Sequence, residues 1–299
     1  MPKPIVVALD PEYEDDGPLV VGTALANLID APVMVVGAYL HDPITNAVSA
    51  GTIDAESRAA VLSALMPRTA GVDADVLVMG GPSPARVLHD AAMELGASLL
   101  VVGSPRRMAG GRLAPGTTAE RLLHGSPCPV VVVPRRLPPD WTPRRIAAGF
   151  TDLDDGHRAL RVAATLASAA RTELRAVTAV EPIDWGRSAA VAPYGAGGAD
   201  EARRIAKQEL EAAIGQLAPE TTVVPYVVVA HPVHALVDLS ADVDLIVCGS
   251  RGYGPVRAVL LGGVTHTLVR KAHCPVLVVP RGIEPALAGE PERWEAATP

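Results

Sequence analysis

Two glycine-rich segments follow apolar runs of the chain, and their residue types suit the binding of an anion such as phosphate. The later segment, Gly249-Ser-Arg-Gly252-Tyr-Gly254, is followed by Gly262-Gly263 and by a stretch of helical spacing that contains Thr265. Glycine lets backbone N–H groups approach an oxyanion closely, and the first N–H groups and the dipole of a helix favour negative charge. The order of strand, loop and helix therefore predicts a phosphate-binding loop, with ordinary turn glycines as the alternative.

The same pattern occurs 146 residues earlier in the chain. Leu-Leu-Val-Val-Gly-Ser at 99–104 aligns with Leu-Ile-Val-Cys-Gly-Ser at 245–250, and the agreement continues without a gap over more than thirty residues. Agreement of this length in one register indicates a duplicated domain. Prolines in residues 135–143 mark the join, because they exclude a continuous helix or central strand. We expect copy one at residues 1–137, copy two at 143–282 and a disordered tail at 283–299.

Short β-branched runs alternate in each copy with Ala-rich segments at helical spacing, a pattern typical of parallel strands joined by crossover helices. In copy one we expect strands at 4–10, 32–40, 73–79, 98–103 and 129–134 and helices at 16–30, 54–66, 84–95 and 117–124. In copy two we expect strands near 144–150, 173–180, 222–229, 244–249 and 275–280. A chain that is 49% hydrophobic but only 3% aromatic suits buried parallel strands under Ala-rich helices. The sequence predicts an α/β fold: two tandem five-stranded parallel open sheets with helices on both faces.

The chain resembles the universal stress protein family, whose ATP-binding members carry Gly-x2-Gly-x9-Gly-Ser/Thr after strand four and an Asp that ends strand one. The resemblance covers nearly the whole chain in tandem form and implies a Rossmann-like fold of the adenine nucleotide alpha hydrolase type. Copy two matches with Gly249, Gly252 and Gly262. Gly263 stands where the family has Ser or Thr, and Thr151 stands at the position of the Asp.

Copy one departs from the family motif at another place. Its matching residues are Asp10, Gly103, Gly116 and Thr117. Arg106 replaces the second glycine; its planar donor suits phosphate, but its side chain fills the space that glycine leaves for the backbone approach. These residues also have explanations that involve no ligand, since Thr117 begins a good capping box and Asp10 could be a solvated carboxylate at the end of a strand.

The resemblance implies a stress-response regulatory protein that binds ATP or a related adenine nucleotide. A Mg²⁺ ion accompanying ATP would use Asp10 or Asp152. The resemblance also implies that the two copies pair internally through their fifth strands, Val130–Val133 and Val276–Val279, whose apolar edges invite pairing. A homodimer of whole chains is a further expectation. The alternative function is a scaffold or interaction module of the same fold that binds no nucleotide.

Other classes of function find little support in the sequence. It has no Gly-Lys-Ser/Thr after the loop, no G-x-G-x-x-G after a first strand, no G-x-S-x-G elbow and no HExxH, which leaves at most a weak ATPase. His234 and Asp238 share a helical face, but we interpret them as polar surface residues rather than as metal ligands. A net charge of -7 without basic runs argues against nucleic acid as a partner. Three cysteines without a CxxC pair suit the reducing cytoplasm, and no stretch reaches the length of a membrane helix.

Overall fold

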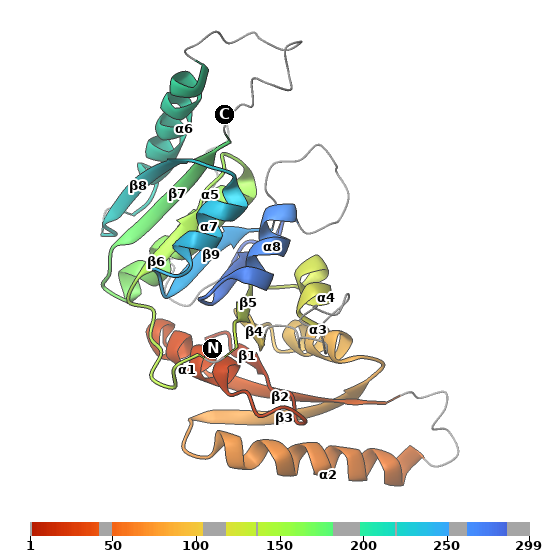
Figure 1. Ribbon diagram of the computed structural model, residues 1–299. Coiled ribbons are helices and arrows are strands. Elements are labelled where there is room, and N and C mark those ends of the chain that lie inside the picture. The colour runs from red at the N-terminus through yellow and green to blue at the C-terminus, as the bar shows by residue number, and fades with distance from the viewer. Residues whose placement is uncertain are drawn as a thin grey trace, which may run out of the picture.

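A computed structural model describes residues 2–41, 50–103, 118–135, 137–181, 198–218, 220–250 and 262–285 of the chain (Figure 1). Copy one consists of β1 (Ile5–Ala8), α1 (Gly17–Ile29), β2 (Val33–Leu40), α2 (Ala50–Thr69), β3 (Ala74–Gly81), α3 (Pro84–Glu94), β4 (Leu99–Gly103), α4 (Thr118–Gly125) and β5 (Val130–Val133). Copy two consists of β6 (Ile146–Gly149), α5 (Asp154–Ala169), β7 (Leu174–Val180), α6 (Gly198–Ile214), β8 (Val223–Val229), α7 (Pro232–Leu239), β9 (Leu245–Gly249), α8 (Gly263–Lys271) and β10 (Val276–Val279).

The ten strands form one sheet in the order β3-β2-β1-β4-β5-β10-β9-β6-β7-β8. Within each copy the neighbouring strands are parallel, whereas β5 and β10 pair antiparallel, so the two five-stranded sheets meet edge to edge. In each copy the first strand lies between the second and the fourth, and the winding of the chain reverses there. The predicted fold class, a tandem Rossmann-like α/β arrangement, is confirmed.

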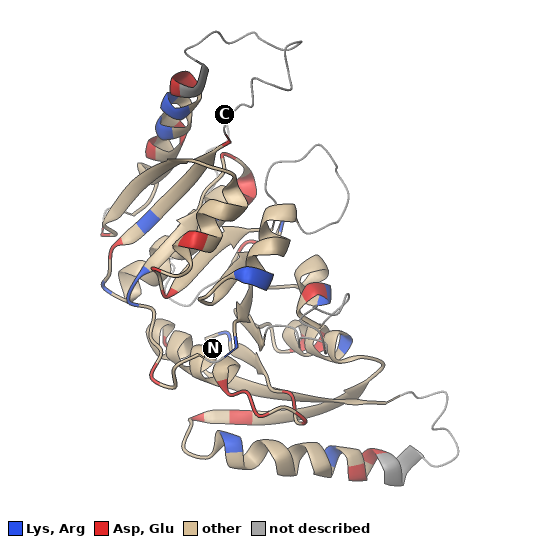
Figure 2. Cartoon of the chain, viewed as in Figure 1, with Lys and Arg blue, Asp and Glu red and all other residues tan. Residues whose placement is uncertain are grey.

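Both faces of the sheet are covered by helices. Successive side chains of a strand point to opposite faces, so Leu99 and Val101 of β4 pack with one core and Leu100 and Val102 with the other. The first core lies under α1, α2, α5 and α6, and the second under α3, α4, α7 and α8. Each core runs across both copies. Because the inner strands are buried on both faces, charged residues are rare in the strands, and of the ten only β3 and β7 contain one each, Asp75 and Arg175 (Figure 2).

The starts of α3 and α7 follow local sequence signals, whereas α2 begins at Ala50, ahead of the expected start at residue 54. Ser83 caps α3 through a hydrogen bond from the Arg86 N–H, with Pro84 in the first turn, and the His231 side chain accepts from the Val233 N–H at the start of α7. None of the helices in the described ranges has the length and apolarity required to cross a membrane.

Helix α2 is longer than the sequence predicts. We expected it to end at residue 66, before Pro67, yet it continues to Thr69. The Thr69 hydroxyl lies 3.3 Å from the Leu65 carbonyl oxygen and 3.2 Å from the Met66 carbonyl oxygen, and its one proton is shared between these two acceptors in the last turn of the helix. Arg68, which lies between Pro67 and Thr69, makes long-range hydrogen bonds that are described below. The tendency of Pro67 to end a helix is therefore outweighed here by contacts with distant parts of the chain.

The tail predicted from residue 283 is described only at Ile283–Pro285, and residues 286–299 lie outside the described part. Glu284 contacts helix α5. Its carboxylate oxygens lie 3.2 Å from Arg158 Nε and 3.0 Å from an Arg161 terminal nitrogen.

Candidate functional site

A pocket in copy two lies at the carboxyl ends of β6, β7 and β9, where the winding reverses. Parallel open sheets bind their ligands in this place. Its walls include Phe150 and Thr151 after β6, Ala179 of β7, Leu236 of α7 and Thr265 of α8. The lining is mostly apolar, and the cavity volume is about 40 Å³. At roughly 10–15 Å³ for each water molecule, the cavity has room for about three waters.

The helix after the glycine-rich loop begins at the edge of this pocket. Gly262 caps α8, and its N–H donates to the Ser250 carbonyl at 2.9 Å, so the two ends of segment 251–261 are tied together. That segment, with the predicted Gly252, lies outside the described residues. A Cβ atom added at Gly263, in the first turn of α8, would meet none of the described residues within 4 Å. As far as these residues go, the position that carries a hydroxyl in the family motif is open to a side chain.

Gly249, at the end of β9, is required by packing within the protein. A Cβ atom there would lie 2.8 Å from Asp155 Cβ and 3.0 Å from the carbonyl carbon and oxygen of Asp155. Contacts this short force a shift of the backbone at the start of α5. Glycine is therefore needed at residue 249 at least because helix α5 packs against it.

Asp155 brings a buried carboxylate to the end of β9. The Ser250 hydroxyl donates to Asp155 Oδ2 at 3.3 Å, and an Arg158 terminal nitrogen lies 3.4 Å from Asp155 Oδ1. The Asp155 side chain is 7% exposed. Since α5 presents its N-terminus here, the carboxylate also interacts favourably with the helix dipole.

Thr265 lines the pocket but uses its hydroxyl inside the protein. The Thr265 hydroxyl donates to the Gly249 carbonyl at 2.9 Å, and the residue is buried. This bond ties α8 to the end of β9 and satisfies a carbonyl at the strand terminus. Next to it, burial raises the pKa of Cys248 to about 12. Neither group is a ready proton acceptor at neutral pH.

Thr151 stands at the carboxyl end of β6, where the sequence placed it, and it lines the pocket. Its backbone is packed against α5, because a Cβ atom at Gly156 would lie 2.0 Å from the Thr151 carbonyl oxygen. The neighbouring Asp152 is exposed, and its Oδ1 lies 2.8 Å from His157 Nε2.

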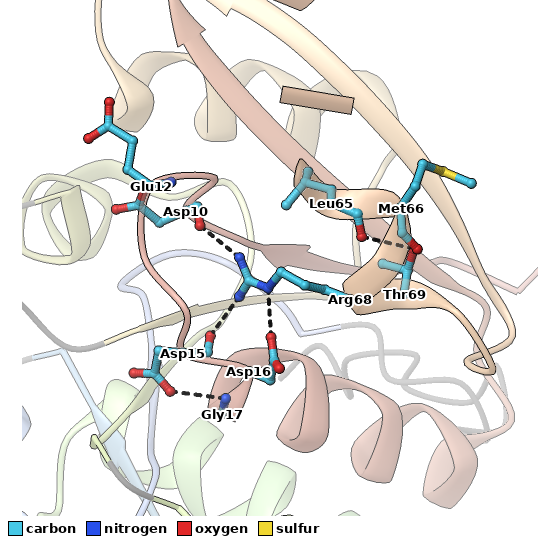
Figure 3. Close-up of polar contacts among 9 residues, drawn as sticks. All are labelled: Asp10, Glu12, Asp15, Asp16, Gly17, Leu65, Met66, Arg68 and Thr69. Carbon is cyan, nitrogen blue, oxygen red and sulfur yellow. Dashed lines mark hydrogen bonds and ion pairs between the residues drawn. The ribbon is translucent and has the colours of Figure 1, made fainter. Parts of the chain in front are cut away.

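In copy one, Asp10 lies two residues beyond the end of β1 and is exposed (Figure 3). Its carboxylate accepts a hydrogen bond from the Glu12 N–H at 3.0 Å. Arg68, from the end of α2, donates to the Asp10 carbonyl at 2.8 Å, to the Asp15 carbonyl at 3.0 Å and to Asp16 Oδ1 at 2.7 Å. One guanidinium thus fixes the loop between β1 and α1.

Gly103 is the copy-one counterpart of Gly249, yet its surroundings differ. A Cβ atom there would meet only Pro18 Cγ, at 3.5 Å, which is ordinary van der Waals contact. The described residues therefore do not require glycine at this position. The other predicted residues of copy one, Arg106, Gly116 and Thr117, lie outside the described part of the chain.

The structure thus brings Thr151, Gly249 and Thr265 together around one pocket. Sequence reasoning interpreted Asp155 only as a carboxylate at a helix start, and it missed Ser250 and Arg68. The Gly-Ser pair repeated at 103–104 and 249–250 was a signal for Ser250, whereas Arg68 acts on residues more than fifty positions away and leaves no local pattern. Within the described residues, no three His, Cys, Asp or Glu side chains form a group that could hold a metal ion.

The fold and the pocket define a class: tandem Rossmann-like α/β proteins with a small, mostly apolar pocket where the winding reverses. The sequence profile of the Universal stress protein family matches residues 1–134 and 142–280. Universal stress protein Rv2319c of Mycobacterium tuberculosis is 29% identical over 203 residues, which cover 64% of this chain and 68% of that protein. Universal stress protein Rv2005c of the same species is 27% identical over 291 residues, covering 92% and 96%.

A solved universal stress protein from Archaeoglobus fulgidus DSM 4304 has the same fold, with a TM-score of 0.59 and 19% identity over 94% of this chain and 99% of that one. The chain belongs to the universal stress protein family, as the sequence motif predicted, and both copies match it.

Proposed function

We propose that this protein is a stress-response regulator that binds ATP or a related adenine nucleotide in copy two, with little or no hydrolysis. The observation that carries the proposal is the pocket between α7 and α8, which joins an apolar cavity to the start of a helix. An apolar cavity suits a flat base, and the N-terminus of α8 suits phosphate.

Nucleotide binding in this pocket requires the walls to move. Small-molecule pockets usually have about 300–1,000 Å³, whereas this cavity has about 40 Å³. The base would therefore displace apolar side chains such as Leu236 of α7, which is 7% exposed and lines the cavity. We propose that α7 and α8 separate when the nucleotide binds.

Phosphates would meet backbone N–H groups at the start of α8, where Gly263 leaves the approach open. The described residues do not fit a dedicated Mg²⁺ site, since Asp152 pairs with His157 and Asp10 closes a local turn. A Mg²⁺ ion would therefore be carried by the phosphates themselves.

The residues that line the pocket favour little or no hydrolysis of the nucleotide. The titratable side chain among its lining residues is Cys248, whose pKa is raised to about 12 by burial. A thiol in this state is neither a nucleophile nor a general base at neutral pH. The nucleotide is thus proposed as a regulatory ligand.

An interaction module without nucleotide is the second candidate, and specific contacts favour it. The Thr265 hydroxyl is already used by the Gly249 carbonyl, and Gly249 is explained by its contact with Asp155. In this case the loops would be structural, and the surface would carry the function.

The two candidates differ in what the purified protein contains. The protein is denatured and the released small molecules are identified, and the emptied protein is then titrated with ATP, ADP and AMP. Release of an adenine nucleotide, or binding below millimolar concentration, supports the first candidate. An empty protein that binds none of the three at millimolar concentration overturns it and leaves the interaction module.

We further propose that the copies span residues 1–137 and 143–282, with a tail at 283–299, and that β5 and β10 stay paired in solution. The three cysteines are free and buried, which supports a place in the reducing cytoplasm. A homodimer of whole chains would use surfaces other than β5 and β10, because these edges face one another.

A further inference from the structure

Strand β8 has an apolar edge at one end of the sheet, and β3 lies at the opposite end (Figure 1). None of the described strands pairs with the outer edge of β8. Its residues, Val-Val-Pro-Tyr-Val-Val-Val, include no charged side chain, and Tyr226, Val228 and Val229 are 42%, 36% and 48% exposed. An exposed apolar edge of this kind is a template for pairing with a strand of another chain.

The protein itself shows that apolar edges of this fold join. Strands β5 and β10 consist of valine and leucine alone, and they pair antiparallel between the two copies. Strand β8 is similar in its β-branched and aromatic residues and its lack of charge, which is the composition of segments that associate strongly. Pro225, in the middle of β8, is the residue that departs from this composition.

The backbone nitrogen of Pro225 points away from the sheet. The Leu174 N–H donates to the Thr222 carbonyl at 2.9 Å, and the Ala230 N–H donates to the Val180 carbonyl at 3.1 Å. Along a strand in a parallel ladder, successive residues direct their N–H and C=O groups alternately to the two sides. The backbone groups of even-numbered residues in β8 therefore face β7, and those of odd-numbered residues, including Pro225, face the outer edge.

A second β8 strand could add to this edge only through the outward-facing residues 223, 225, 227 and 229. Antiparallel pairing about a twofold axis, with Tyr226 opposite a second Tyr226, would use all four of them. This register places Pro225 opposite Val227 on both sides of the axis. Because proline has no N–H, each Val227 carbonyl would lack its donor, and the proline ring would fill the space of the hydrogen bond. Pro225 therefore disrupts the centre of the ladder.

The equivalent edge of copy one differs at the same place. Strands β3 and β8 both begin opposite the first residue of the strand beside them. Counted from there, Asp75 of β3 corresponds to Val224 of β8, and Val76 corresponds to Pro225. Asp75 is exposed. A charge and a proline are two means by which natural sheets protect an edge strand, and each copy contains one of them.

We propose that Pro225 keeps β8 from pairing with the β8 strand of a second molecule, and that Asp75 has the same effect at β3. The partner that is excluded is a second copy of this chain, joined edge to edge as β5 and β10 are joined within one chain. This inference concerns the ends of the sheet and is independent of nucleotide binding.

Pro225→Val restores the missing donor at the outer edge. We expect it to strengthen self-association at least about tenfold over the native protein, measured by sedimentation velocity over a range of protein concentrations. Tyr226→Val is the matched control, because it also adds a β-branched residue, but its N–H faces β7 and the outer edge keeps its proline. It should associate as the native protein does. A Pro225→Val protein that associates no more strongly than the native one overturns the proposal, as does equal association of Tyr226→Val.

Hydrogen exchange shows whether the new contact lies at β8. In the native protein the outward N–H groups of Val227 and Val229 have no partner among the described strands, so they should exchange rapidly. In the associated Pro225→Val protein their exchange should be slowed at least about tenfold. Association without this protection contradicts the proposal, because the molecules would then meet at another surface.

A second change in the Pro225→Val chain tests the role of the charge in copy one. Val224→Asp introduces a carboxylate at the position that corresponds to Asp75, and in the twofold register it would lie against Val228 of the other molecule. Burying a carboxylate there is unfavourable, so association should return to within about twofold of the native level. A double variant that associates as strongly as Pro225→Val contradicts the role assigned to Asp75.

The comparison requires a folded variant, which circular dichroism checks. If Pro225→Val does not fold, Pro225→Ala, which restores the same N–H with a smaller side chain, takes its place in all three measurements. Native-like association of a folded Pro225→Ala protein then overturns the proposal.

Discussion

Asp155 and Gly249 are packed so closely that a Cβ atom at residue 249 would lie 2.8 Å from the Asp155 Cβ. The contact joins the first turn of α5 to the end of β9, and Gly249 also lines the pocket in copy two. In copy one the equivalent contact is looser, with 3.5 Å between a Cβ atom at Gly103 and Pro18 Cγ. Contacts among the described residues therefore require glycine at residue 249 in copy two but not at residue 103 in copy one.

Gly249→Ala is expected to lower the free energy of unfolding by about 1–3 kcal/mol, because the backbone of α5 must shift to admit the methyl group. Gly103→Ala, the equivalent change in copy one, should alter it by less than about 0.5 kcal/mol. Urea denaturation of both variants measures the difference. Equal effects would show that the contact with Asp155 does not carry the requirement for glycine.

Gly263→Ser restores the hydroxyl that the family motif carries at this position. The site is open to a side chain, so the fold should be unaffected, and a hydrogen bond to a charged phosphate should raise nucleotide affinity about tenfold. Calorimetry with ATP measures the change. Gly125→Ser, at an equally open glycine ending α4, is the control and should leave affinity as it is. A Gly263→Ser protein with unchanged affinity would place the phosphates elsewhere.

Arg68→Ala should release the loop between β1 and α1. Arg68 is 13% exposed and binds two carbonyls and Asp16, so we expect a loss of about 1–3 kcal/mol of unfolding free energy. Arg86 also pairs with an aspartate, Asp90, but it is 65% exposed, and Arg86→Ala should cost at most about 0.5 kcal/mol. Denaturant midpoints of the two variants provide the comparison, and similar losses would contradict the assigned role of Arg68.

The buried thiols predict a loss of stability in alkali. Burial raises the pKa of Cys128 from 9.0 to about 11 and that of Cys274 from 9.0 to about 12. A pKa raised by folding stabilises the native state below the ordinary value, and this contribution is lost as pH rises from about 9 toward 11–12. Unfolding free energies measured across this range should fall, and Cys128→Ala should flatten the fall. A native protein whose thiols ionise near pH 9 would refute this.

Much of the fold was predictable because its signals are local. The short apolar runs of β4 and β9 indicate strands, and Ser83-Pro84 indicates the start of α3, in each case from neighbouring residues alone. The repeat itself identified which residues are equivalent. Thr151, Gly249 and Thr265 line one pocket, because the carboxyl ends of parallel strands lie at one edge of a sheet, and their part in binding a ligand stays a prediction.

The remainder depends on contacts between distant segments. Arg68, at the end of α2 just after Pro67, binds the Asp15 carbonyl in the loop between β1 and α1, and Ser250 donates to Asp155 across 95 positions of the chain. No spacing in the sequence encodes such pairs. The role of Thr265 was likewise hidden, since only the structure shows its hydroxyl bonded to the Gly249 carbonyl.

The central claim is that the pocket of copy two binds an adenine nucleotide, and a pocket-filling pair of variants tests it. Ala179 of β7 lines the pocket, and the matching strand registers make Ala38 of β2 its equivalent in copy one. Ala179→Leu fills the cavity, whereas Ala38→Leu makes the same change in the other copy. Calorimetric titration with ATP should show binding to the native protein and to Ala38→Leu, and at least about a tenfold loss of affinity in Ala179→Leu. Undiminished binding to a folded Ala179→Leu protein, or no binding to the native protein, would contradict the claim.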